Sequence, residues 1–195
     1  KLMKDLAGKS VIVQTYQNAV ATGLFDDVYV VTDSELIFKE IETNGGKAIM
    51  SIAEHECGSD RIAEAVVGID CDIVVNVQGD EPLLASENVS QVATLLNNSS
   101  APMATLSVAI EEQDEVFNPN AVKVVSDINK NALYFSRASI PFDRSAMLNN
   151  DSVLDITPFQ RHVGIYAYRA GFIKQYIELS VSPLEVLESL EQLRV

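Results

Sequence analysis

A chain of 195 residues is long enough for one domain with a substantial core, but two domains of equal size would be cramped. Hydrophobic residues make up 47% of the chain and charged residues 22%, and no apolar run is long enough to span a bilayer, which argues against disorder and membrane insertion. The formal net charge of −14 argues against a nucleic-acid surface, since phosphate contacts need clustered Lys and Arg. The only two cysteines, Cys57 and Cys71, form no disulfide framework or metal clip, so a reducing cytoplasm is the expected location.

The first half of the chain alternates between helical and strand patterns. Apolar spacing predicts helices over residues 8–21, 35–43, 61–67 and 86–97. Short β-branched or apolar runs predict strands over 28–33 and 47–50 and within 71–78. Strands joined by helices of this length indicate parallel pairing with right-handed crossovers.

Beyond residue 101 the pattern changes to strands with few helices between them. Strands are expected over 103–110, 121–126, 132–136 and 162–168, with a hairpin turn through 127–131. An antiparallel extension of a parallel sheet follows from this order. Residues 144–158 show no periodicity and are expected to form an irregular loop.

The strand within 71–78 runs directly into Gln78, Gly79 and Asp80. In α/β sheets, ligands bind beyond the carboxyl ends of the strands. Asp80 therefore stands where a divalent cation and a polyphosphate could meet, and Gly79 allows backbone or ligand to approach closely. The alternative is that this segment is only a polar turn, because turns use the same residues.

Two further segments offer groups suited to an anionic or polyhydroxylated ligand. Residues 55–61 place small residues before a helix, where Ser59 could cap it and backbone N–H groups could receive an anion; an ordinary helix cap is the alternative. Arg137 and Arg144 flank a proline bend, and a guanidinium donates two parallel hydrogen bonds to a carboxylate or phosphate, although either could be a surface charge.

On the strand over 162–168, His162, Gly164 and Tyr166 share one face. The glycine leaves a hollow between the imidazole and the phenol that suits a polyhydroxylated ligand better than a metal ion. The alternative is a core histidine beside an aromatic pair.

A helix start is expected over 182–185, with Ser as N-cap, Pro at the first position and Glu three residues after the cap. Leu184, Leu187 and Leu190 would then mark its buried face. Glu188, Glu191 and Gln192 lie off that stripe, so a solvated face is the plain interpretation of these three residues.

Five motifs, in order, resemble those of the 3-deoxy-manno-octulosonate (Kdo) cytidylyltransferases, and the resemblance covers almost the whole chain. The motifs lie at residues 76–82, 117–125, 132–138, 161–166 and 190–194. The resemblance implies an α/β fold of the Rossmann-like nucleotidyltransferase type, also called nucleotide-diphospho-sugar transferase, with a mostly parallel sheet and an antiparallel extension. It also implies a Mg²⁺-dependent reaction in the cytoplasm for lipopolysaccharide synthesis, in which the Kdo hydroxyl attacks the α-phosphate of CTP and expels pyrophosphate.

The resemblance also assigns roles to single residues. Asp80 matches the metal-binding aspartate, and Lys1 matches the last basic residue of the loop that grips the phosphates. The cytidine region and the sugar-acid pocket are matched by two larger sets. These are His55, Gly58, Ser59, Arg61 and Gln78 for the nucleotide, and Arg137, Arg144, His162, Tyr166, Glu191 and Gln192 for the sugar acid.

The resemblance implies one nucleotidyltransferase domain over residues 1–195, in which residues 103–170 include an extension for dimerisation and the sugar pocket, and hence a homodimer. The family's N-terminal strand and phosphate loop, and a C-terminal segment with a second metal aspartate, are not among these residues, so we expect a piece of a longer protein with poor turnover by itself. Cys57 and Ser59 stand where the family more often has Ser and Thr. The alternatives are a CMP-sialate synthetase or another sugar nucleotidyltransferase, or a non-catalytic module that binds a sugar acid or a nucleotide.

Overall fold

The computed structural model describes residues 1–53, 55, 58–148 and 154–195, and it divides the chain into two compact units. The first unit comprises Lys1–Ala104 and Gly164–Glu178, and the second comprises Thr105–Val163 and Leu179–Val195. The sequence predicted one domain with an extension over 103–170, and most of that extension belongs to the second unit. Cys57 and residues 149–153 of the loop predicted over 144–158 lie outside the described residues. The prediction of an irregular loop is wrong for residues 144–148, which form a short helix.

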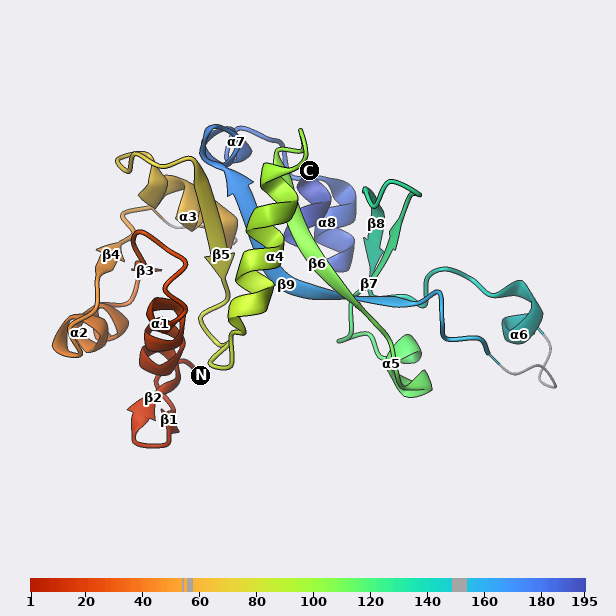
Figure 1. Cartoon of the computed structure of the whole chain (residues 1–195), viewed down its shortest axis with the longest axis horizontal. Helices are drawn as coiled ribbons and strands as arrows, with labels where there is room; N and C mark the ends of the chain where they lie inside the picture. The colour runs from red at the N-terminus through yellow and green to blue at the C-terminus, as the bar shows by residue number, and fades with distance from the viewer. Residues whose placement is uncertain (54, 56–57, 149–153) are drawn as a thin grey trace. The chain divides into compact units, whose positions relative to one another are not determined.

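The first unit begins with a small hairpin and a helix (Figure 1). Strands β1 (Asp5–Leu6) and β2 (Lys9–Ser10) pair antiparallel. Helix α1 (Val11–Ala21) follows at once, and the Ser10 hydroxyl accepts a hydrogen bond from the backbone N–H of Val13. The predicted helix over 8–21 therefore starts three residues late, because Gly8 has a φ of +87° in the hairpin turn.

A parallel pair of strands follows. Strands β3 (Val30–Thr32) and β4 (Ala48–Met50) pair in register and are connected by α2 (Glu35–Thr43), as the alternating pattern predicted. Ile41 is fully buried and packs with residues of α1, which fixes this βαβ element against the first helix. The carboxyl ends of both strands lie at the same edge, where ligands bind in α/β folds.

Strand β5 (Ile73–Val77) pairs antiparallel with the end of β9 (Gln160–Arg169), with Ile73 opposite Arg169 and Val77 opposite Ile165. Within the described residues, the parallel part of the sheet structure is thus the β3–β4 pair, a smaller share than predicted, whereas β5 joins the antiparallel part.

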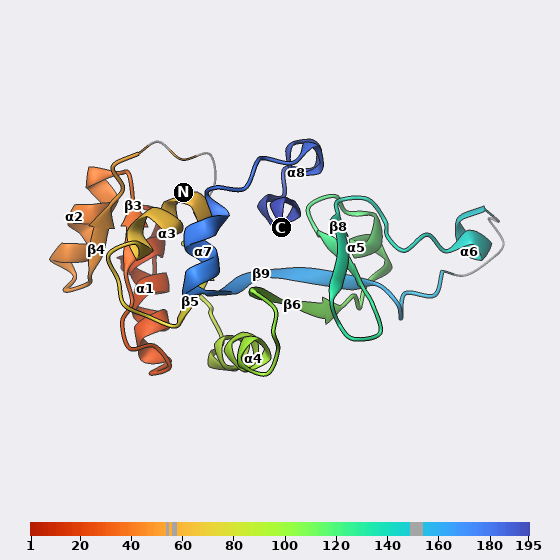
Figure 2. The ribbon, with the colours of Figure 1, turned by 90° about the horizontal axis from the view of Figure 1, so that it is seen from above.

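Helices lie on both faces of the β5–β9 pair. Figure 2 shows α3 (Gly58–Val66) and α7 (Ala170–Tyr176) on one side and α4 (Ser86–Asn97) on the other. A core cluster that includes Ala63, Tyr168, Ile173 and Tyr176 fills the space on the α3 and α7 side. This burial is the main source of stability for the unit.

The second unit is mostly antiparallel, as predicted. Strands β7 (Lys123–Ser126) and β8 (Ala132–Ser136) form the expected hairpin, in whose turn the Asp127 carboxylate accepts the backbone N–H groups of Asn129 and Asn131, each at 2.8 Å. β7 also pairs with the start of β9, and β6 (Met103–Ala109) pairs with β9 as well.

The remaining elements of the second unit are short. They are α5 (Gln113–Phe117), α6 (Arg144–Leu148), α8 (Pro183–Glu188) and the 3₁₀ helix η1 (Glu191–Arg194). The capping box at Ser182 and Glu185 is confirmed. The predicted leucine face is wrong, since Leu184 and Leu187 are 47% and 81% exposed and only Leu190 is buried. Since α8 ends at Glu188 and Ser189 adopts a left-handed φ of 51°, Leu190 lies outside the helix and its burial does not continue a helical face.

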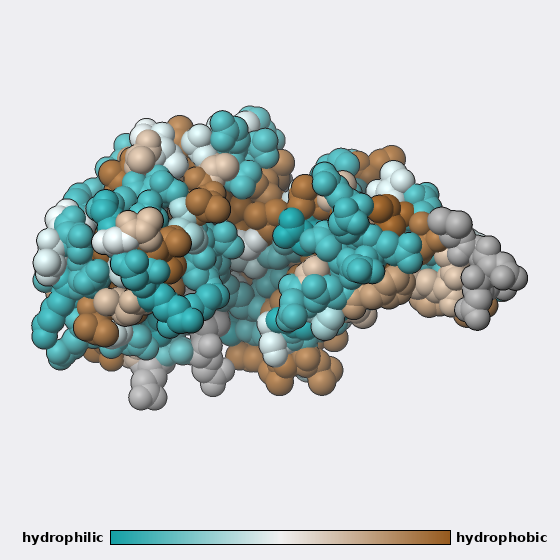
Figure 3. All heavy atoms as spheres, turned by 90° about the horizontal axis from the view of Figure 1, so that it is seen from below, coloured by the Kyte–Doolittle hydropathy of each residue, from teal (hydrophilic) through white to brown (hydrophobic). Residues whose placement is uncertain are grey.

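The surface of the molecule fits its composition. Figure 3 shows a largely hydrophilic face with scattered apolar patches. Among the described residues, no helix is both long and apolar enough to cross a membrane.

Candidate active site

The loop that follows β5 is fixed by the first helix. The Thr15 hydroxyl donates to the carbonyl of Gly79 at 3.0 Å, and the Asn18 side-chain amide donates to the carbonyl of Pro82. Helix α1 lies so close that a Cβ on Gly79 would be 3.1 Å from Cδ1 of Ile12. A side chain at position 79 would therefore have to displace the tip of Ile12 slightly, so the loop and α1 are closely packed. The sequence did not identify Thr15 or Asn18 as anchors of this loop.

Lys1 and Asp80 form an ion pair at this loop, so the two predicted catalytic residues are brought together. The Asp80 carboxylate raises the pKa of Lys1, and the two side chains are 76% and 36% exposed. The segment is also a turn, because the backbone N–H of Glu81 donates to the carbonyl of Gln78 at 3.0 Å. The two interpretations of this segment are compatible, since the turn presents a carboxylate and an ammonium group to solvent.

His55 is held by a carboxylate that the sequence analysis did not single out. Its Nε2 lies 2.5 Å from Oε2 of Glu64, which also accepts the Ser51 hydroxyl at 2.7 Å. The other oxygen of Glu64 accepts the backbone N–H of Ile52 at 2.9 Å. The hydrogen bonds from His55, Ser51 and Ile52 lower the pKa of Glu64 to about 2, so this carboxylate stays charged and accepts from all three residues.

The N-terminal turn of α3 carries three more predicted nucleotide residues. Gly58 is exposed and has open space where a Cβ would stand, and Arg61 donates to Asp33, just past β3, at 2.8 Å. Ser59 is fully buried, with its hydroxyl 3.0 Å from that of Tyr168. The prediction that Ser59 caps the helix is wrong, because the helix begins at Gly58 and the Ser59 hydroxyl faces the core.

Arg137, at the end of β8, uses three of its donors on main-chain carbonyls. Nε donates to Glu188 at 2.6 Å, Nη1 to Pro119 at 3.0 Å and Nη2 to Ser189 at 3.3 Å. A guanidinium has five N–H groups, so two remain for a sugar-acid carboxylate. The arginine thus joins the end of β8 to the end of α8 and is oriented by those contacts.

Glu188 is a second anchor that the sequence analysis missed, since it had been placed on a solvated face. Its carboxylate accepts the hydroxyls of Ser136 at 2.6 Å and Tyr134 at 3.2 Å, and the backbone N–H of Arg137 at 2.9 Å. These hydrogen bonds lower the pKa of Glu188, with the Ser136 hydroxyl as the largest contributor. Glu191 and Gln192 follow three and four residues later, at the start of η1.

His162 is a neutral hydrogen-bonding group in this structure. Its Nε2 lies 2.9 Å from Oγ1 of Thr105, and its ring packs edge-on against Phe135 with centroids 5.0 Å apart. Burial lowers the pKa of His162 to about 4. At neutral pH it can hydrogen-bond to a hydroxyl but adds no positive charge.

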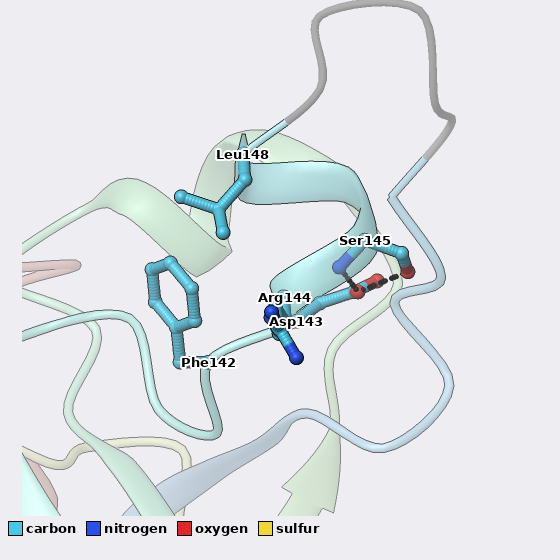
Figure 4. Close-up of a pocket in the computed structure, with 5 residues that line it drawn as sticks. All are labelled: Phe142, Asp143, Arg144, Ser145 and Leu148. Atoms are coloured by element: carbon cyan, nitrogen blue, oxygen red, sulfur yellow. Dashed lines mark hydrogen bonds between the residues drawn. The ribbon is translucent and has the colours of Figure 1, made fainter.

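The last predicted sugar-acid residues lie in different settings. Gln192 is buried in η1. Two residues later, the guanidinium of Arg194 donates hydrogen bonds from Nε and Nη2 to the two carboxylate oxygens of Glu185. Tyr166 belongs to the first unit and stacks on Tyr168 with centroids 6.1 Å apart. Arg144 lies at the start of α6 and lines an open hollow (Figure 4). Among the described residues, none of the other predicted sugar-acid residues lines that hollow, which is formed by Phe142, Asp143, Arg144, Ser145 and Leu148.

The described part of the chain supplies few side chains that could bind one metal ion together. In the described part of the chain, no group of three or more His, Cys, Asp or Glu side chains could hold one. Mg²⁺ usually keeps several waters and binds one or two carboxylates together with substrate phosphates. A partly exposed Asp80 beside the Lys1 ammonium fits that mode of binding, in which phosphate oxygens of a ligand would supply the further contacts.

Comparison with known proteins shows the family to which this chain belongs. A family model described as cytidylyltransferase matches residues 1–195. The 3-deoxy-manno-octulosonate cytidylyltransferase of Pseudoalteromonas translucida is 67% identical over 198 residues, covering 100% of this chain and 78% of that protein. The chain belongs to the cytidylyltransferase family. The protein of the same name from Flavobacterium johnsoniae is 53% identical, with the same coverage of both chains.

Solved structures agree with this membership. A structure described as CMP:2-keto-3-deoxy-manno-octonic acid synthetase complexed with CTP superposes with a TM-score of 0.88 at 37% identity, covering 100% of this chain and 77% of that one. The 4-diphosphocytidyl-2C-methyl-D-erythritol synthase of Anaerococcus prevotii, at 12% identity and a TM-score of 0.58, shares the fold alone; it covers 97% of this chain and 78% of that one. The predicted α/β nucleotidyltransferase fold of this cytidylyltransferase is confirmed.

Proposed function

We propose that the protein transfers the cytidylyl group of CTP to the sugar acid Kdo, giving CMP-Kdo and pyrophosphate. The observation that carries the proposal is the match over the whole of this chain, at 67% identity, to a relative named for this activity. The proposal is supported by the Lys1–Asp80 pair at the carboxyl end of β5, where α/β folds bind their ligands.

The reaction is an in-line displacement at phosphorus. A hydroxyl oxygen of Kdo forms a bond to the α-phosphorus of CTP, the bond from that phosphorus to the bridging oxygen breaks, and pyrophosphate leaves with the electron pair. The hydroxyl proton passes to solvent or to a basic group. Such a displacement depends mainly on position and charge neutralisation, which explains why the described residues contain no activated nucleophile at this site.

The residues of this chain supply those two requirements. The Lys1 ammonium is a point charge for phosphate oxygens, and helix α1 fixes the loop that carries Asp80. His55, Arg61 and the exposed Gly58 at the start of α3 are the proposed nucleotide contacts, together with Gln78, which follows β5. Each of them lies within the first unit.

Magnesium is part of the proposal. Asp80 would hold the ion together with phosphate oxygens of CTP, and the ion would neutralise charge on the phosphates during attack. In the free chain, Lys1 balances the Asp80 carboxylate.

The second unit supplies the proposed contacts to Kdo apart from Tyr166. Two N–H groups of Arg137 are suited to the sugar-acid carboxylate, and neutral His162 is suited to a hydroxyl. Glu191 and Gln192 add hydrogen-bonding groups that match a polyhydroxylated sugar. A homodimer, a cytoplasmic location and a role in lipopolysaccharide synthesis complete the proposal.

The test is pyrophosphate release by the intact protein with CTP, Mg²⁺ and either Kdo or sialic acid. We expect release with Kdo, and release with sialic acid alone would overturn the assignment in favour of a CMP-sialate synthetase. Asp80→Asn should reduce turnover by at least about a hundredfold and change the Mg²⁺ dependence, because it removes a carboxylate at the phosphates. The control Asp26→Asn makes the same chemical change at an exposed site. Equal activities of the two variants would contradict a metal-binding role for Asp80.

A further inference from the structure

Asn76 is a buried polar residue to which the motif analysis assigned no role. It lies in β5 of the first unit, and only 5% of its surface is exposed. Within the described residues, its side-chain amide nitrogen has no hydrogen-bond acceptor. A buried donor without an acceptor costs about 1–3 kcal/mol, so such a group is expected to have a partner in the working state of the protein.

The strand register shows which residues share a face with Asn76. In the antiparallel pair of β5 and β9, Asn76 lies directly opposite Tyr166. Residues opposite one another point to the same side of a sheet, and residues two apart on one strand do as well. Asn76, Gln78 and Tyr166 therefore form a polar row on one face of the pair.

The row has space at its open end. A Cβ on Gly164 would meet only Cγ of Gln78, at 3.8 Å, so the glycine on β9 leaves room beside Gln78. At the other end, Val74 lies opposite Tyr168 and packs in the core cluster. The polar row is thus continuous with the loop that carries Asp80 and is closed by the core behind Asn76.

We infer that Asn76 is a substrate-binding residue whose side-chain amide donates a hydrogen bond to an oxygen of the sugar acid. The inference rests on the proposed function. The amide nitrogen can only donate, so its partner is an acceptor, and a sugar acid carries a carboxylate and several hydroxyl oxygens. The sugar acid is favoured because Asn76 lies directly opposite Tyr166, a proposed sugar-acid residue. Gln78, two residues further along the same face, is a proposed nucleotide contact, so the KM for CTP in the test below decides between the two ligands.

The test compares Asn76→Leu, which removes the amide and keeps a similar volume, with Val75→Ile on the opposite face of the same strand. Since the amide has no partner in the free chain as described, Asn76→Leu should melt at or above the melting temperature of the parent protein. The KM for Kdo should rise about tenfold while the KM for CTP stays within about twofold, as expected for loss of one hydrogen bond to the sugar acid. Val75→Ile should change neither constant.

Deoxy analogues of Kdo identify the accepting oxygen. For the analogue that lacks this oxygen, the parent protein and Asn76→Leu should have the same KM, and a penalty that persists for every analogue would overturn the inference. Unchanged constants for Kdo in Asn76→Leu would mean that only a water molecule satisfies the amide and would also overturn it. A lowered melting temperature with a rise in both constants would mark Asn76 as a structural residue. No pyrophosphate release by the parent protein would instead refute the proposed function itself.

Discussion

Replacement of His162 by Gln tests the effect of burial on this side chain. The pKa of His162 is about 4 in the folded chain, against 6.5 for an ordinary histidine. The unfolded chain therefore binds a proton below pH 6.5 that the folded chain does not bind until near pH 4, so the stability contributed by neutral His162 is present above pH 6.5 and is lost as the pH falls towards 4. From pH 7 to pH 5 the loss is roughly 2 kcal/mol in the free energy of unfolding.

The assay is urea unfolding of the parent and His162→Gln at pH 7, 6 and 5, followed by circular dichroism. The variant should lose about 2 kcal/mol less than the parent between pH 7 and pH 5, because glutamine does not titrate. His55→Gln is the matched control, since it replaces the other histidine of the chain and should leave the contribution of His162 in place. Equal pH slopes for the parent and His162→Gln would refute the assignment of a buried neutral imidazole.

Two further predictions concern the segment from residue 182 to the end of the chain. Arg194→Ala should lower the free energy of unfolding of the intact protein by about 3–5 kcal/mol, because it leaves the buried Glu185 carboxylate without the cation that contacts it at 2.6 Å. Urea unfolding measures this change, and a loss below about 1 kcal/mol would contradict the prediction. Glu188→Gln replaces one of two accepting oxygens with an amide, so we expect the free energy of unfolding to fall by about 1–3 kcal/mol. Compared with the parent protein, the KM for Kdo should increase more than the KM for CTP. Steady-state kinetics with each substrate varied would show equal changes if Glu188 did not orient the Kdo contacts.

The sequence predicted the helices and strands whose signals lie within the element itself. The bounds of α2, α4 and β8 match the structure residue for residue, because helical spacing extends over both helices and a short apolar run with two aromatic residues extends over the strand. The hairpin at Asp127 was predictable for the same reason, since an Asx turn depends on residues two to four positions away.

The features that the sequence did not reveal depend on distant partners. The antiparallel partner of β5 lies about ninety residues away in β9. An apolar run in the sequence does not indicate which strand it will pair with. In the sequence, Glu64 and Glu188 resemble ordinary solvent-exposed acids. Only in the folded chain do backbone N–H groups and hydroxyls from distant positions donate hydrogen bonds to them. The candidate site was found through motifs, whereas the anchors that orient it required the structure.

The hydrogen bonds from Thr15 and Asn18 make the loop after β5 part of the framework of α1. Any displacement of that helix is transmitted to two carbonyls that bracket Asp80, so the helix and the carboxylate shift together. The position of the proposed metal ligand can therefore be altered through changes on the first helix that leave the strand and the motif untouched.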